Sequence, residues 1–188
     1  MLRRILTAGE KIVTAAGDGQ SPELVLIGSR GINAYAFVDG GRPTIAITLG
    51  MVRLLAADDD AWAALIGHEL AHLRLDHLRG MKDRRGKAEL TSSLAAVILS
   101  AVGLPFASLA TDASTALADR AYSRDDEREA DRIGLEYMRK AGVAGAGAIR
   151  LQQLLLNTGN PAAIPFLGTH PGGEERIENL RNLMRSGD

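Results

Sequence analysis

The residues best suited to chemistry form a short motif, His68-Glu69-Leu70-Ala71-His72, in an apolar stretch that continues without a helix breaker to Gly80. On a helix, residues four positions apart lie on the same face, so the imidazoles of His68 and His72 could both bind one Zn²⁺. Glu69 would lie over the same face, where its carboxylate could take a proton from an attacking water molecule. This pattern is typical of the metal-binding helix of a metallopeptidase.

The sequence around the motif favours a buried helix over a chance match. An H-E-x-x-H string also arises by chance on solvated helices that bind no metal. Here Asp58-Asp59-Asp60 supplies carboxylates that suit a helix N-terminus. An apolar stripe follows, made of Trp62, Leu65, Ile66, Leu70 and Leu73. We therefore expect a helix over residues 59–79 that packs into the core, where a bound metal would remove the cost of burying unpaired imidazoles.

A catalytic zinc site needs a third protein ligand and an open position. No His-x-x-Gly-x-x-His sequence follows the motif, so we look for a carboxylate on another helix, and residues 123–131 offer several. Glu127 and Asp131 share one helix face, which favours Glu127 as the ligand and Asp131 as the hydrogen-bond acceptor for a ligand imidazole. Glu129 points to a different face and is predicted to be a surface residue. The charge-dense segment as a whole could also be an ordinary solvated face.

Hydrophobic periodicity predicts the elements that position these residues. An amphipathic helix over residues 2–16 ends at Gly17, and Asp39-Gly40-Gly41 predicts a hairpin turn. The expected strands cover residues 23–27, 34–38 and 43–49, and further helices cover residues 124–140, 146–156 and the segment after Pro171.

Composition narrows the class of protein. With 188 residues and 46% hydrophobic content, the chain should fold as one domain over residues 1–188. A net charge of −1 gives no electrostatic case for nucleic-acid binding. There is no cysteine, which excludes disulfides and thiolate metal sites, and only four histidines occur, His68, His72, His77 and His170.

Residues 94–110 form a long run of small apolar side chains. As a helix it would span only about 26 Å, short of the hydrocarbon core of a bilayer, and Gly103-Leu104-Pro105 interrupts it. We expect a buried helix or a flap over the cleft, with a membrane or partner contact as the alternative.

Three motifs together resemble the gluzincin metallopeptidases of the HtpX, BepA and LoiP type, the family of the CAAX prenyl protease and the mitochondrial Oma peptidase. They are His68-Glu69-x-x-His72, Ser123-Arg124-x-x-Glu127-x-x-Ala130-Asp131, and Thr169-His170-Pro171 followed by Glu175-Arg176-Ile177. Ile32-Asn33-Ala34 also resembles the family segment that precedes its edge strand. The chain departs from the membrane-embedded members because it has no convincing transmembrane helix.

The resemblance implies one Zn²⁺ per chain, bound by His68, His72 and Glu127, with Glu69 as general base and Asp131 as the outer carboxylate. It also places His170 and Arg176 near the scissile carbonyl, where they would stabilise the oxyanion. His77 matches a frequent family position and is interpreted as structural.

We expect an α+β fold, a mainly helical zincin-like core with a small mixed or antiparallel sheet and the H-E-x-x-H helix at its centre. The expected function is zinc-dependent endoproteolysis in protein quality control of the cell envelope. A peptide or unfolded protein would bind along an edge strand at residues 43–49. The alternative is a non-catalytic zinc-binding, chaperone-like or membrane-surface protein.

The expected location follows from the same resemblance, which suggests the periplasm or cell envelope. The basic N-terminus, Met1-Leu2-Arg3-Arg4, is not followed by the apolar core of a signal peptide. A cytosolic location therefore stays open.

Overall fold

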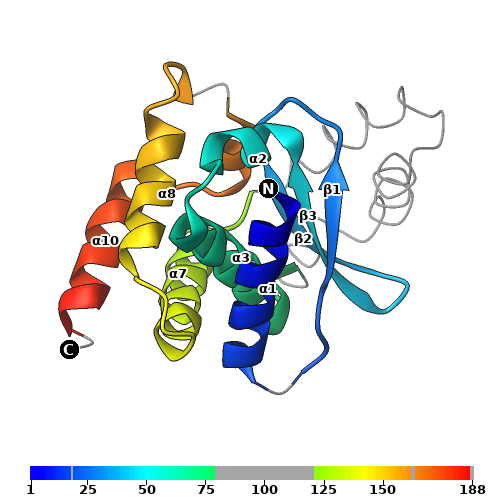
Figure 1. The fold of residues 1–188 in the computed structure, drawn as a ribbon. Coiled ribbons are helices and arrows are strands. Elements are labelled where there is room, and N and C mark those ends of the chain that lie inside the picture. The colour runs from blue at the N-terminus through cyan, green and yellow to red at the C-terminus, as the bar shows by residue number, and fades with distance from the viewer. Residues whose placement is uncertain (18, 79–120, 162–163, 187–188) are drawn as a thin grey trace.

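The computed structural model describes residues 1–17, 19–78, 121–161 and 164–186 (Figure 1). Its elements are α1 (Leu2–Ala16), β1 (Glu23–Ile27), β2 (Ala34–Asp39), β3 (Arg42–Thr48), α2 (Leu49–Leu55), α3 (Asp59–Arg74), α7 (Arg124–Lys140), α8 (Ala146–Leu156), α9 (Pro165–Thr169) and α10 (Gly173–Ser186). The predicted α+β class, with more helix than strand, is confirmed. The apolar run at residues 94–110 lies outside the described residues.

The three strands form a mixed sheet in the order β1-β3-β2, with β1 parallel and β2 antiparallel to β3. The prediction that residues 43–49 form an edge strand is wrong, because β3 pairs with a neighbour on each side. The polar residues Thr44 and Thr48, near the two ends of β3, are both buried. The hydroxyl of Thr48 donates to the Asn33 carbonyl and accepts from the amide of Met51, so it keeps hydrogen-bond partners although it is buried.

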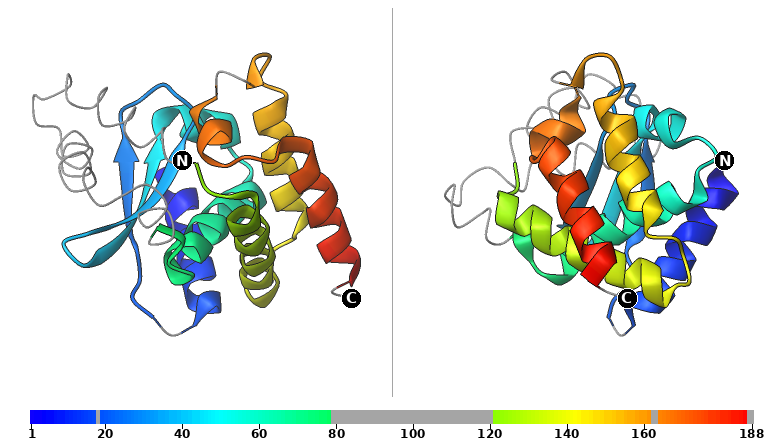
Figure 2. Two further views of the ribbon diagram at one scale, coloured as in Figure 1. Left: turned by 180° about the vertical axis from the view of Figure 1, so that it is seen from behind. Right: turned by 90° about the vertical axis from the view of Figure 1, so that its left-hand side faces the viewer.

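Helix α3 lies at the centre of the fold, as predicted. It packs against α1, α7, α8 and the sheet, and every residue from Ala61 to His72 is buried. The sheet lies on one side of α3 and helices α8 and α10 on the other, as Figure 1 and the reverse view in Figure 2 show. Asp58 begins the helix by accepting a hydrogen bond from the amide of Ala61. The helix ends at Arg74, earlier than predicted, and the chain turns back through Asp76 at φ 52°.

Two glycines allow α3 and α7 to approach almost to backbone contact. A Cβ on Gly134 would lie 3.2 Å from the carbonyl carbon of Gly67 and 3.2 Å from the amide nitrogen of His68. A Cβ on Gly67 would lie 3.3 Å from the carbonyl oxygen of Gly134. This spacing brings the first turn of α7, with its acidic residues, against the histidine face of α3.

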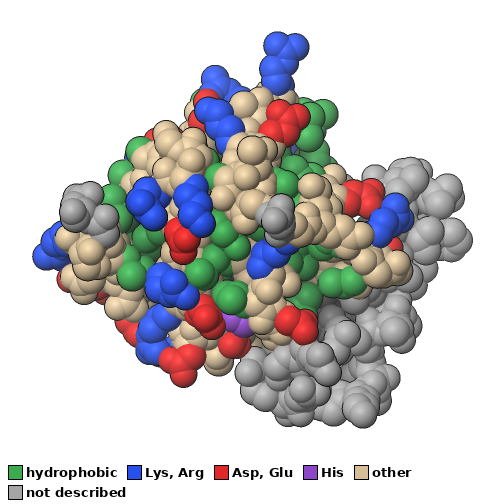
Figure 3. Space-filling model, turned by 90° about the horizontal axis from the view of Figure 1, so that it is seen from below, with side chains coloured by type: hydrophobic (Ala, Val, Ile, Leu, Met, Phe, Trp, Pro, Cys, Tyr) green, Lys and Arg blue, Asp and Glu red, His purple; other side chains and the backbone are tan. Residues whose placement is uncertain are grey.

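The face of the molecule shown in Figure 3 carries acidic and basic side chains with apolar side chains between them. Within the described ranges, no helix combines the length and the apolar character needed to cross a bilayer.

Candidate metal centre and catalytic site

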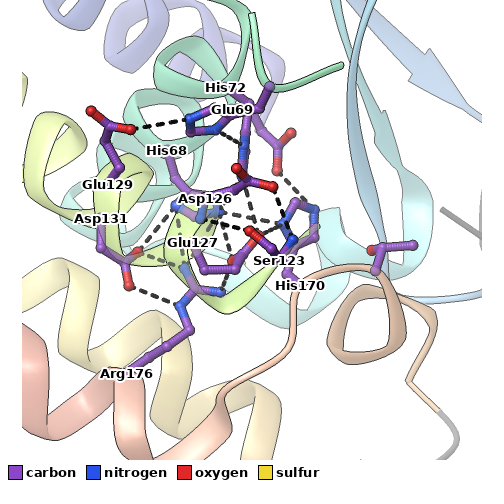
Figure 4. A network of polar contacts seen from close by, with 12 residues as sticks. His68, Glu69, His72, Ser123, Asp126, Glu127, Glu129, Asp131, His170 and Arg176 are labelled. Carbon is purple, nitrogen blue, oxygen red and sulfur yellow. Dashed lines mark hydrogen bonds and ion pairs between the residues drawn. The ribbon is translucent and has the colours of Figure 1, made fainter. Parts of the chain in front are cut away.

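The two motif histidines point into one buried site from successive turns of α3 (Figure 4). His68 Nε2 and His72 Nε2 lie 3.0 Å apart, and both side chains are almost fully enclosed. The rings meet edge to face, with centroids 4.6 Å apart. The sequence therefore placed both imidazoles correctly, on one helix face and in the core.

Glu127 reaches the same point from the first turn of α7. Ser123 and Asp126 form a reciprocal capping box that fixes this turn. The carboxylate of Glu127 then lies 3.3 Å from His68 Nε2 through Oε2 and 3.3 Å from His72 Nε2 through Oε1. Glu127 is the acid that the sequence favoured, and the structure brings it to the two histidines.

His170 approaches from the end of α9 and joins the same group. Its Nδ1 lies 3.0 Å from Glu127 Oε1 and 3.4 Å from His68 Nε2, while its Nε2 lies 3.5 Å from Glu69 Oε1. The ring of Phe166 stacks on it at 4.2 Å. The sequence alone did not predict that His170 would lie within reach of the metal donors.

The donor set fits a zinc ion. One atom each from His68, His72, Glu127 and His170 lie within 4.8 Å of one another, and all four residues are buried. Imidazole nitrogen and carboxylate oxygen are ligands that Zn²⁺ favours. Glu69 is also fully buried beside them, and in the described part of the chain neither of its side-chain oxygens has a hydrogen-bond partner. A carboxylate held this way needs a cation or a water molecule nearby.

Asp131 and Arg176 surround the donor set on the α10 side. Asp131 Oδ1 lies 3.1 Å from His68 Nδ1, the position predicted for it. Arg176 donates to both oxygens of Asp131, at 2.8 Å from Nε and 2.6 Å from Nη2, and its Nη1 lies 2.7 Å from Glu127 Oε2. These contacts hold both carboxylates in place, and the oxyanion role of Arg176 stays a prediction.

A second set of contacts surrounds His72. Its Nδ1 lies 2.8 Å from Nδ1 of His77, whose Nε2 lies 3.5 Å from Glu129 Oε2. The ring of Tyr122 stacks on His72 at 3.7 Å with an angle of 14° between the planes. Sequence reasoning assigned no part in the site to Tyr122 or Glu129. Two signals pointed to this contact, the five-residue spacing from His72 to His77 and the match of His77 to a frequent family position.

Burial and neighbouring charges shift the pKa values of Glu69, His72 and His68 in different directions. Burial raises the pKa of Glu69 and lowers that of His72 well below its ordinary value, which favours a neutral imidazole. Burial also lowers the pKa of His68, but contacts with Glu127 and Asp131 outweigh it and raise that pKa to about 9. A bound cation would take the place of that proton among the carboxylates.

The two buried carboxylates of α7, those of Glu127 and Asp131, stay ionised despite their burial. Burial alone would raise the pKa of Glu127, but the neighbouring His170 and the charge of Arg176 hold it well below its usual range. The Arg176 charge likewise outweighs burial at Asp131 and lowers its pKa. The site therefore offers anionic oxygens to a cation, as a metal ligand and its supporting carboxylate require.

The comparisons with known proteins agree with this geometry. The model of peptidase family M48 matches residues 3–184. The putative beta-barrel assembly-enhancing protease of Vibrio cholerae is 32% identical over 94% of this chain and 38% of its own length. The mitochondrial metalloendopeptidase OMA1 of Bos taurus is 31% identical over 85% of this chain and 32% of its own length. The metalloprotease LoiP of Escherichia coli is 25% identical over 89% of this chain and 64% of its own length. The chain thus spans well under half the length of the first two relatives.

Proposed function

Because the chain belongs to peptidase family M48, we propose that it is a zinc metalloendopeptidase of the gluzincin type. His68, His72 and Glu127 would hold one Zn²⁺, with Asp131 supporting His68. The observation that carries the proposal is that these donors converge from two helices beside Glu69, a buried carboxylate whose oxygens have no hydrogen-bond partner in the described part of the chain. A site that only stabilised the fold would have no use for that carboxylate.

The chain's own residues supply the proton transfers. When bound, Zn²⁺ would polarise the scissile carbonyl and lower the pKa of the attacking water to about 7. Glu69 would take the proton from that water and return it to the leaving amine, a role that its raised pKa suits. His170 Nε2, 3.5 Å from Glu69 Oε1, is close enough to the reacting groups to donate to the developing oxyanion. Arg176 would act with it or hold the carboxylates in place.

We propose that the substrate is an extended peptide or unfolded protein that adds to the outer edge of β2. Ile32, just before β2, accepts a hydrogen bond from the amide of Phe166, the residue whose ring stacks on His170. The start of β2 is therefore the part of the sheet beside the site. Among the described strands, β2 pairs on one side alone, with β3, which leaves its other edge for the main chain of an extended peptide.

The cellular role is proposed from the relatives. One relative is named as a protease that enhances beta-barrel assembly. By analogy, the chain would act in protein quality control of the cell envelope, in the periplasm. A cytosolic location is the alternative.

A non-catalytic zinc protein is the second candidate, and the position of His170 favours it. Four protein donors around one point are typical of a closed, structural zinc site, whereas a catalytic site keeps one position open. The two candidates differ in whether the protein turns over peptides.

Cleavage of casein and of a peptide library, measured together with zinc content, tests the proposal. We expect wild-type protein to cleave, and Glu69→Gln to keep its zinc and its fold while losing hydrolysis, because an amide cannot take the proton from water. A wild-type protein that holds zinc and cleaves no peptide would favour the non-catalytic candidate.

A further inference from the structure

The two motif histidines present the same ring nitrogen, Nε2, to the carboxylate of Glu127. His68 and His72 both face Glu127 through Nε2, within 3.3 Å, and both turn Nδ1 away from it. The Nδ1 of His68 meets a carboxylate, Asp131, at 3.1 Å. The Nδ1 of His72 meets another imidazole, that of His77, at 2.8 Å. His72 therefore depends on a partner that can itself be either donor or acceptor.

Only one arrangement of protons leaves His72 able to bind a metal through Nε2. Its Nε2 must carry a lone pair, so its Nδ1 must carry the proton and donate it to His77. Nδ1 of His77 must then accept, and the proton of His77 must be on Nε2. That nitrogen lies 3.5 Å from the carboxylate of Glu129, which favours an N–H there. The opposite arrangement would place a proton on His72 Nε2, where the metal must bind.

We propose that His77 and Glu129 are positioning residues that hold His72 in the tautomer that binds the metal, an inference that rests on the zinc site of the proposed function. One helix, α7, would then supply a metal ligand, Glu127, and the outer carboxylates for both histidines, Asp131 directly and Glu129 through His77.

The local structure is built for this contact. The turn at Asp76, with φ 52°, brings His77 back against His72 after α3 has ended. Tyr122 stacks on the His72 ring and fixes its plane, which keeps Nδ1 directed at His77. His77, at 7% exposed, is the most accessible of the four histidines. The Glu129 side chain is 49% exposed, so solvent weakens its influence.

Zinc affinity, measured by chelator competition on the full chain, tests the proposal. We expect His77→Ala to weaken binding by about 10- to 100-fold, the usual cost of losing an outer partner. Glu129→Ala should weaken it less, and should have no further effect once His77 is alanine, because Glu129 acts through His77. Glu136→Ala is the matched control, a partly exposed glutamate on α7 that is paired with Lys140, and should leave the affinity unchanged.

Imidazole nitrogen NMR on the zinc-loaded wild-type protein tests the same point without a mutation. With four histidines in the chain, the expected spectrum has His77 protonated at Nε2 alone and His72 at Nδ1. A proton on His77 Nδ1 would overturn the proposal. Equal zinc affinities for Glu129→Ala and Glu136→Ala would also overturn it. So would a further loss of zinc affinity when Glu129→Ala is added to His77→Ala. A chain that binds no zinc would overturn both proposals, whereas zinc binding without cleavage would overturn only the proposed function.

Discussion

At the scale of single residues, the surroundings of two buried carboxylates shift their pKa values in opposite directions. Glu127 is surrounded by positive charge and has a lowered pKa, whereas Glu69 is dominated by burial and has a raised pKa. A metal ligand must be ionised and a general base must be able to hold a proton, so the two environments suit the two proposed roles.

Glu127→Ala should weaken zinc binding by more than the roughly 100-fold upper range for outer partners, because it removes a ligand and also one of the two buried carboxylates that His68 and Arg176 contact. Asp125→Ala, a highly exposed carboxylate in the same turn, is the control and should bind normally. Equal affinities for the two variants, measured by metal competition, would remove Glu127 from the ligand set.

His170→Ala should lower kcat by about 10²- to 10³-fold with little change in KM or zinc content, as expected for a donor that acts mainly on the oxyanion. Steady-state kinetics and a thermal melt measure this together. Unchanged turnover with a lowered Tm would reduce His170 to a structural residue. A rise in kcat would show instead that His170 occupies the position that the attacking water needs.

At the scale of elements, the sequence predicted the helices and strands near the site more closely than their arrangement. The helical period depends on local spacing, and the helix predicted over residues 124–140 formed with those bounds. The helix predicted over residues 59–79 begins where expected but ends at Arg74. The order of the strands depends on pairing between distant segments, and local alternation could not show that β3 is central. The short helix α2 was missed because its first residue, Leu49, continued the apolar pattern of the strand.

The same distinction holds for the site. The i, i+4 spacing was enough to place His68 and His72 together and to favour Glu127, because each relation lies within one helix. The contact of His170 with Glu127 joins positions far apart in the chain, and only the resemblance had drawn attention to His170. Glu129 was predicted to be a surface residue, and its half-exposed side chain nevertheless reaches His77.

Gly134→Ala should separate α3 from α7, because the new Cβ would meet the backbone of Gly67 and His68 at 3.2 Å. Overpacking of this kind typically costs about 1–3 kcal/mol, and here it should also weaken zinc binding by moving Glu127. Gly28→Ala is the control, since its Cβ would meet no atom within 4 Å. Chemical denaturation should show a loss of stability and metal competition a loss of zinc affinity in Gly134→Ala, and neither loss in Gly28→Ala. Wild-type stability and zinc affinity in Gly134→Ala would contradict the close approach of α3 and α7.

At the scale of the whole molecule, the proposed metal joins helices that are distant in sequence. His68 and His72 lie on α3, Glu127 lies on α7, and His170 follows α9. A ligand that binds only the folded state stabilises it in proportion to the logarithm of its concentration over Kd. Metal binding and global stability should therefore change together.

Stripping the metal with a chelator should lower Tm. With free zinc at about 1,000 times Kd, the stabilisation is about 4 kcal/mol, which for a domain of this size corresponds to a shift on the order of 10 °C. The double variant His68→Ala, His72→Ala should show no response to zinc. A melt of wild-type protein that is unaffected by zinc would contradict the proposed metal centre.

The most direct test of the central claim is a zinc titration of the chelator-stripped protein, with bound metal and peptide cleavage followed in the same samples. We expect cleavage to rise with bound zinc and to reach its maximum at one zinc per chain, and Glu69→Gln to give the same binding curve with no cleavage. Cleavage that survives stripping, or saturation with zinc that never yields cleavage, would contradict it.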